Sequence, residues 1–166
     1  MKKILVAAAI VLVGSAIFTS CTKKYVTEGS NSNDNSAYSM TYTLTQSSWQ
    51  YDNSNACYYV SLQDQNLTSD ITDNGAVWIY ISLDGGNNYE LLPSMSNQGY
   101  NFIGIAGDGG FTIDAFPVDA TVTAAPNFQI IVKEVNIPGL NQNQAASVNF
   151  KDLKSVEKTY VIKNMN

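Results

Sequence analysis

Apolar and polar residues alternate with a period of two along much of the chain. Between residues 38 and 45, aromatic or aliphatic side chains alternate with serine and threonine, which is typical of a strand with one buried face. The same pattern recurs in segments separated by glycine, asparagine or proline. The expected strands are 38–45, 47–51, 58–62, 76–83, 89–92, 100–106, 111–116 and 128–135.

About seven or eight short strands at regular spacing predict a mainly β fold, either an antiparallel β-sandwich or a barrel, and we take the sandwich as the expected fold. Residues 84–88 and 107–110 are rich in glycine, aspartate and asparagine and are expected to reverse the chain as hairpin turns. The C-terminal part differs, because Leu153, Val156 and Tyr160 recur at helical spacing. We expect one short helix over 150–160, with Asn149 as its N-cap, packed on the sandwich.

The first 21 residues have the pattern of an export signal. Lys2 and Lys3 precede an uncharged run, 4–18, of 15 apolar or small residues, whereas a membrane-spanning helix needs about 20. The run ends in Phe-Thr-Ser-Cys at 18–21, which resembles the lipobox of bacterial lipoproteins. The expected organisation is a signal peptide at 1–20, a lipidated Cys21 with a flexible linker at 21–37, and a sandwich domain with its helix at 38–166; plain secretion is the alternative.

The lipobox resemblance also implies a location. Two or more acyl chains on Cys21 are sufficient for stable membrane attachment. In lipoproteins of this kind an aspartate after the cysteine retains the protein at the inner membrane, and here Thr22 follows. The following residues, Lys23 and Lys24, are basic rather than acidic, which disfavours export to the cell surface. We therefore expect an outer-membrane lipoprotein in the periplasmic leaflet.

The charge of the chain argues against a nucleic-acid partner. The chain has 14 acidic residues, nine lysines, no arginine and no histidine, and a net charge of −5. Eleven of the acids lie in 25–132, which contains no basic residue. Nucleic-acid binding needs a basic surface, so no nucleic-acid partner is expected.

Composition also argues against catalysis. Without histidine, the usual triads and zinc sites cannot be assembled, so we expect a protein that is not an enzyme, with no catalytic residue and no metal-site motif. A structural Ca²⁺ on an oxygen-rich loop stays open as a cofactor. The segment 70–81 begins like an EF-hand loop but has Ile81 where the closing glutamate would stand. Cys57 lies in an apolar run and is expected to be buried and inert.

Aromatic residues are the remaining candidates for binding. Tyrosine and tryptophan rings with polar tips stack on sugars or fill protein interfaces. Trp49, Tyr51 and Tyr59 are the candidate ligand-facing rings, although core packing is the competing interpretation for all of them. Tyr58 and Tyr59 are expected to face opposite sides of their strand.

Part of the chain resembles a known kind of domain. The runs YYVSL at 58–62, ITDNGAVWIYI at 71–81, DGG at 84–86 and LLP at 91–93 resemble the C-terminal domain of collagen-like-repeat lipoproteins of Bacteroidota-type bacteria, a family that is largely uncharacterised. The resemblance implies an envelope location and a β-rich fold but no reaction. The collagen-like tract itself is absent here, and an Asn/Ser-rich linker takes its place.

Together these features predict a non-enzymatic cell-envelope lipoprotein with a structural or binding role. Its expected partners are the membrane, through Cys21, and a glycan or an envelope protein. The alternative hypothesis is a carbohydrate-binding module or another carbohydrate-active accessory protein, and a third is a subunit of a larger complex.

Overall fold

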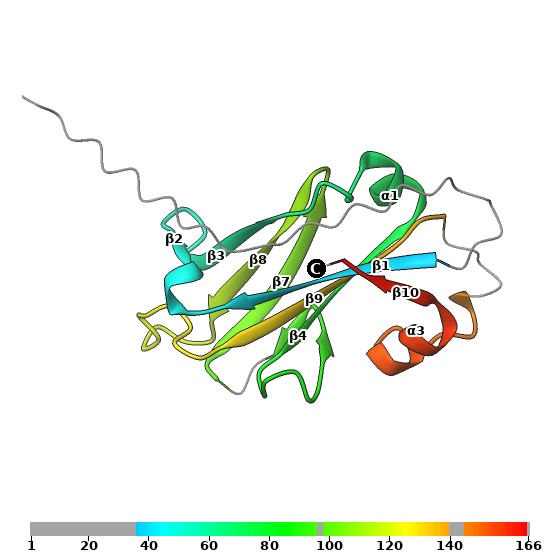
Figure 1. The fold of residues 1–166 in the computed structure, drawn as a ribbon. Coiled ribbons are helices and arrows are strands. Elements are labelled where there is room, and N and C mark those ends of the chain that lie inside the picture. Colours follow the sequence, from blue (N-terminus) through cyan, green and yellow to red (C-terminus); the bar gives the residue numbers. More distant parts are fainter. Residues whose placement is uncertain (1–35, 96–97, 140–144, 166) are drawn as a thin grey trace, which may run out of the picture.

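The computed structural model describes residues 36–95, 98–139 and 145–165, and shows a β-sandwich of two five-stranded sheets (Figure 1). Sheet A has the strand order β10 (Val161–Asn164), β1 (Ser36–Leu44), β9 (Ile130–Ile137), β4 (Ala76–Ser82) and β5 (Glu90–Leu91). Sheet B has the order β2 (Gln50–Asp52), β3 (Cys57–Gln63), β8 (Gly110–Pro117), β7 (Tyr100–Gly107) and β6 (Ser94–Met95). The pairs are antiparallel except β1 with β10. The mainly β sandwich expected from the sequence is thereby confirmed, while the signal peptide, Cys21 and the linker up to residue 35 lie outside the described residues.

The main core lies between the two sheets. In sheet A, Tyr42 on β1 and Ile81 on β4 both pair with Val132 on β9, so their side chains share one face. The alternation that predicted the strands is the reason for this face, because every second residue points inward. The inter-sheet cluster also holds rings from sheet B, among them Phe102 and Phe111.

The outer faces of the two sheets are covered differently. Helix α3 (Leu153–Thr159) packs on sheet A, where Leu153 and Val156 contact Tyr80, Val135 and their neighbours in a second buried cluster. The outer face of sheet B carries exposed aliphatic residues instead, with Ile103 38% and Ile105 55% exposed. Helix α3 therefore covers the outer face of sheet A, whereas the outer face of sheet B is exposed to solvent.

The prediction of a strand over 47–51 is wrong in its first part. Residues Gln46–Ser48 form a 3₁₀ turn, and β2 begins only at Gln50. The hydroxyl of Ser48 accepts from the backbone N–H of Thr45 at 3.1 Å, and the backbone N–H of Ser48 bonds the carbonyl of Thr45 at 2.9 Å. Serine and threonine hydroxyls compete with strand hydrogen bonds in this way, so the local turn replaces the first half of the expected strand.

The C-terminal helix exists but begins later than predicted. Its N-cap is Asp152, whose carboxylate accepts from the backbone N–H of Lys154 at 3.0 Å, rather than Asn149. Asn149 instead caps a preceding turn by accepting from the N–H of Lys151. Besides the 3₁₀ turn, three elements were not predicted: helix α1 (Ser69–Asn74), the short strand β6, and strand β10, which the Ser39–Asn164 side-chain hydrogen bond ties to β1. Of the helices in the described ranges, none has the length and apolar character needed to cross a bilayer.

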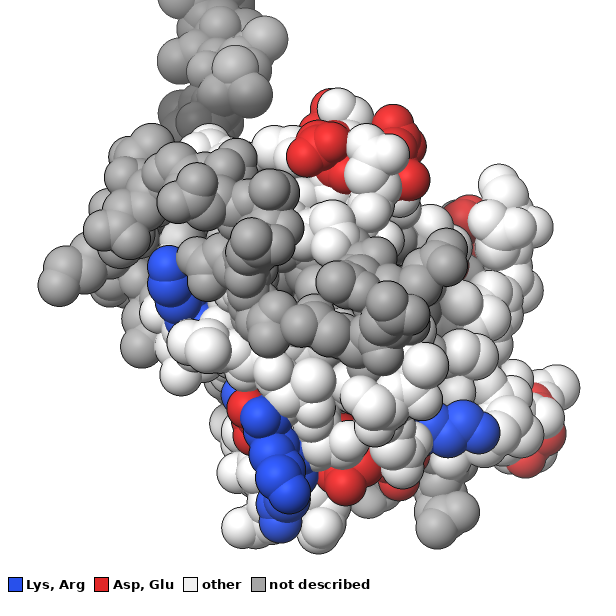
Figure 2. All heavy atoms as spheres, turned by 90° about the vertical axis from the view of Figure 1, so that its right-hand side faces the viewer, with Lys and Arg blue, Asp and Glu red and all other residues white. Residues whose placement is uncertain are grey.

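The face drawn in Figure 2 has acidic side chains gathered at its top, whereas lysines and further acidic side chains lie together in its lower half. Figure 2 shows acidic side chains gathered at the level of α1, which carries Asp70 and Asp73, and lysines lower down at the level of α3, which carries Lys154 and Lys158. Among the described residues, Lys133 of β9 pairs with Glu157 of α3.

Candidate binding site

The hairpin of β2 and β3 forms one wall of a solvent-open hollow. Its turn is fixed by Asp52, whose carboxylate accepts from the backbone N–H of Ser54 at 2.7 Å and from the side-chain amide of Asn55 at 2.8 Å. Ala56 closes the turn at φ 51°, a conformation that residues other than glycine rarely adopt. Aspartate and asparagine favour such turns because their side chains bond nearby backbone groups.

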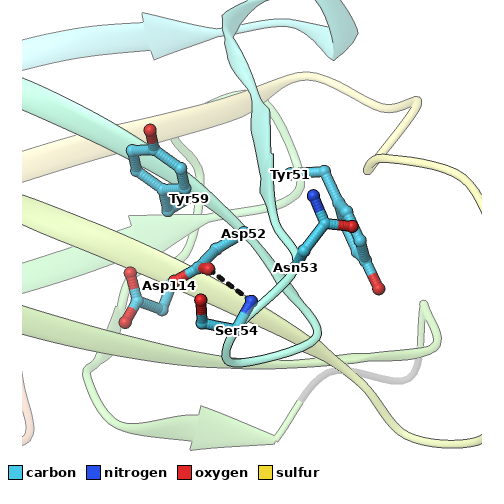
Figure 3. Close-up of a pocket in the computed structure, with 6 residues that line it drawn as sticks. All are labelled: Tyr51, Asp52, Asn53, Ser54, Tyr59 and Asp114. Atoms are coloured by element: carbon cyan, nitrogen blue, oxygen red, sulfur yellow. Dashed lines mark hydrogen bonds between the residues drawn. The ribbon is translucent and has the colours of Figure 1, made fainter.

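The hollow is lined by polar side chains and two tyrosines. It has a volume of about 530 Å³ and is lined by six residues: Tyr51, Asp52, Asn53, Ser54, Tyr59 and Asp114. Figure 3 shows Tyr59, Asp52, Ser54 and Asp114 on one side of β2. Tyr59 pairs with Asp114 of β8 and with Gln50 of β2, so these three side chains share the outer face of sheet B. The hydroxyl of Tyr59 donates to Oε1 of Gln50 at 2.8 Å, which orients the ring.

Tyr51 and Asn53 point to the opposite side of β2 from Asp52 and Ser54 (Figure 3). Tyr51 is 49% exposed, and its ring centroid lies 4.9 Å from that of Tyr58. It also borders a second hollow of about 630 Å³, whose lining is mostly apolar and includes Tyr58, Phe116 and Val122. The two tyrosines predicted as ligand-facing therefore lie on one hairpin and both line the first hollow, and Tyr51 also lines the second.

The prediction that Trp49 also faces a ligand is wrong. It is only 8% exposed and packs in the inter-sheet core, with its ring centroid 6.1 Å from that of Phe102. An indole buries more apolar area than a tyrosine ring and gains correspondingly more from the core. Trp49 therefore packs in the core directly before β2 and is not available to a ligand.

The two carboxylates of the hollow differ in their affinity for protons. Hydrogen bonds from Asn55 and Ser54 lower the pKa of Asp52, whereas burial, and then the nearby Asp52, raises the pKa of Asp114. No lysine in the described part of the chain lines the hollow, so the charge of its lining residues is negative. Cys57 lies at the end of β3 opposite Asp52 and is free and buried, as predicted. Burial, with Asp114 and Asp52, raises its thiol pKa, which leaves it unreactive as a nucleophile.

Such a hollow suits a neutral or cationic ligand that is rich in hydroxyl groups. Carboxylates accept hydrogen bonds from hydroxyls, Ser54 can donate or accept, and the face of a tyrosine ring packs against the C–H face of a sugar. An anionic ligand would be repelled, since no basic residue of the described ranges lines the hollow beside Asp52 and Asp114. Sequence reasoning found Tyr51 and Tyr59 but missed both aspartates, because Asp114 reaches the hairpin only through the pairing of β3 with β8.

Comparison with family models, with curated proteins and with solved structures finds no match for this chain. Within the described ranges, no group of three or more histidine, cysteine, aspartate or glutamate side chains is placed to hold a metal ion.

Proposed function

We propose that this chain is a non-enzymatic outer-membrane lipoprotein, held on the periplasmic leaflet by Cys21, whose sandwich is a binding module. The observation that carries the binding role is the convergence of Tyr59, Asp52 and Asp114 in one open hollow. The ligand that this chemistry favours is a neutral or amino-bearing glycan, which unites the binding role with the carbohydrate hypothesis. The lack of histidine in the sequence supports binding rather than turnover.

The position of the hollow suits a tethered binding protein. It lies on the outer face of sheet B, whereas α3 occupies the outer face of sheet A. A flexible linker of the length expected at 21–37 would let the domain turn this free face towards a ligand while the acyl chains stay in the membrane.

The anchor is tested by Cys21→Ala. In cell fractionation the wild-type protein should sediment with outer membranes, and the variant should appear in the soluble fraction. Intact-mass measurement of the mature protein should place the acyl mass on the fragment that begins at residue 21. A variant that still sediments with membranes, or a mature protein that keeps residues 1–20, would show that the anchor proposal is wrong.

The binding role is tested on a glycan array that carries neutral, amino-bearing and acidic oligosaccharides. We expect binding to neutral or amino-bearing members, and its loss in both Tyr59→Ala and Asp114→Asn. Ile105→Ala is the matched control, because Ile105 is exposed on the same face of sheet B but does not line the hollow. Preference for acidic glycans, or binding that survives both site variants, would contradict the assignment; release of shortened sugars from a bound oligosaccharide would contradict the non-enzymatic role.

A further inference from the structure

Three buried polar side chains meet between the sheets. Asp64 follows β3 of sheet B, whereas Glu134 and Asn136 lie on β9 of sheet A, and their exposed fractions are 2%, 0% and 1%. Glu134 pairs with Met40 on one side and Ile79 on the other, which places it on the inward face of sheet A among core residues. These three side chains, which we call the inter-sheet acidic cluster, thus sit where apolar packing would be expected.

One amide group joins the two carboxylates. Nδ2 of Asn136 donates to Oδ2 of Asp64 at 3.2 Å and to Oε1 of Glu134 at 3.0 Å. The other carboxylate oxygen of Asp64 accepts from the backbone N–H and the side-chain amide of Asn66, at 2.8 and 2.9 Å. Both carboxylates are therefore held in place, one from each sheet.

Oxygen atoms outnumber donors in the inter-sheet acidic cluster. Oε2 of Glu134 and Oδ1 of Asn136 are buried and have no hydrogen-bond partner within the described parts of the chain. No lysine of those parts forms an ion pair with Asp64 or Glu134. Leaving buried oxygens without partners destabilises a fold, and buried charges are normally paired or bound to metal ions. The cluster therefore lacks a positive partner.

We propose that Asp64, Glu134 and Asn136 form a binding site for one Ca²⁺ ion between the two sheets. Ca²⁺ is bound by carboxylate and amide oxygens at about 2.3–2.6 Å in irregular geometry, whereas Mg²⁺ needs a regular octahedron and keeps several waters. Turning the Asn136 amide by half a rotation would put its oxygen where Nδ2 lies, 3.0 and 3.2 Å from the two carboxylate oxygens. Spacings of roughly 3 Å are those of neighbouring ligands around one Ca²⁺ ion.

Electrostatics around the cluster also favour a cation. Two carboxyl groups, those of Asp64 and Glu134, are buried against the same amide nitrogen of Asn136, at 3.2 and 3.0 Å. Negative potentials of this kind concentrate cations.

The experiment uses the full chain, purified in detergent and treated with EDTA. Equilibrium dialysis against CaCl₂, followed by metal analysis, should give one Ca²⁺ per chain, and the midpoint of thermal unfolding should rise by several degrees. Glu134→Gln and Asp64→Asn, which keep the side-chain shapes, should each abolish both effects. Asp73→Asn, at an exposed acid of α1, is the matched control and should bind Ca²⁺ like the wild type.

Two results would overturn the site. If the wild type takes up no Ca²⁺ and its unfolding midpoint is the same with CaCl₂ and with EDTA, the cluster is neutralised by a proton alone. If uptake persists in both Glu134→Gln and Asp64→Asn, Ca²⁺ binds elsewhere on the chain. Far-ultraviolet circular dichroism of the two variants distinguishes loss of the site from loss of the fold.

Discussion

The hydroxyl of Tyr80 donates a hydrogen bond of 2.8 Å to the backbone carbonyl oxygen of Phe150. Tyr80 lies on β4 and is fully buried under the C-terminal segment, and the ring of Phe150 stacks on that of Trp78 at a centroid distance of 4.5 Å. This pair of contacts fixes the chain just before α3 and so holds the helix on sheet A.

Tyr80→Phe should therefore destabilise the fold. The substitution leaves the carbonyl of Phe150 without its buried donor, and we expect the free energy of unfolding in urea to fall by about 1–3 kcal/mol. Tyr59→Phe is the control, because the Tyr59 hydroxyl bonds an exposed side chain, and its effect should be below about 0.5 kcal/mol. Equal effects of the two substitutions would show that the Tyr80 contact does not anchor the C-terminal segment.

Trp49→Ala should act on stability rather than directly on a ligand. Truncation of a buried tryptophan leaves a cavity, and the expected loss is about 3–5 kcal/mol. Tyr51→Ala, two residues along at a half-exposed ring, should cost markedly less. Both are measured by chemical unfolding; a Trp49→Ala protein as stable as the Tyr51→Ala protein would contradict the core position of Trp49.

Gly75 joins α1 to β4 at a point where a side chain does not fit. A Cβ atom there would lie far inside contact distance of the carbonyl oxygen of Ile137 and 2.9 Å from that of Ile71. Gly75→Ala should therefore lower the free energy of unfolding by about 1–3 kcal/mol. At Gly107 a Cβ would meet nothing within 4 Å, and Gly107→Ala should change stability by less than about 0.5 kcal/mol. Calorimetric unfolding midpoints of the two variants provide the comparison.

The alternation of apolar and polar residues was sufficient to predict most strands, because it is a local signal in the sequence. The inward residues of β1 and β8 occupy every second position, and the structure keeps that period from Met40 to Leu44 and from Phe111 to Ala115. The sequence could not show which strands become neighbours. The hollow around Tyr59 depends on the pairing of β3 with β8.

The inter-sheet acidic cluster was beyond sequence reasoning for the same physical reason. Asp64 and Asn136 are 72 positions apart, and an acidic residue within an apolar strand, such as Glu134, is by default expected to face solvent. At residues 46–48, hydroxyl groups bonding the local backbone replaced the strand that alternation predicted. Both errors arise where polar side chains bond to specific partners.

Asp84 provides a test of acid stability. The backbone N–H of Asn88, the hydroxyl of Ser82 and the side-chain amide of Asn88 lower the pKa of Asp84 to about 2 from an ordinary value of 3.8. Because the pKa is lower in the folded state, the ionised carboxylate stabilises the fold above about pH 4, and this contribution is lost as the pH falls towards 2. These bonds also close the turn between β4 and β5, since Ser82 accepts from the N–H of Gly86 at 2.8 Å.

We therefore expect Asp84→Asn to have a lower unfolding midpoint than the wild type at neutral pH, and the difference to narrow as the pH falls from about 4 to 2. The measurement is the thermal midpoint as a function of pH, recorded by circular dichroism. Asp108→Asn, at an exposed acid in the turn between β7 and β8, is the matched control. It should change the pH dependence of the thermal midpoint between about pH 4 and 2 less than Asp84→Asn does. A difference between wild type and Asp84→Asn that stays constant with pH would mean that the charge of Asp84 is not what holds the turn, because an effect of shape alone does not titrate.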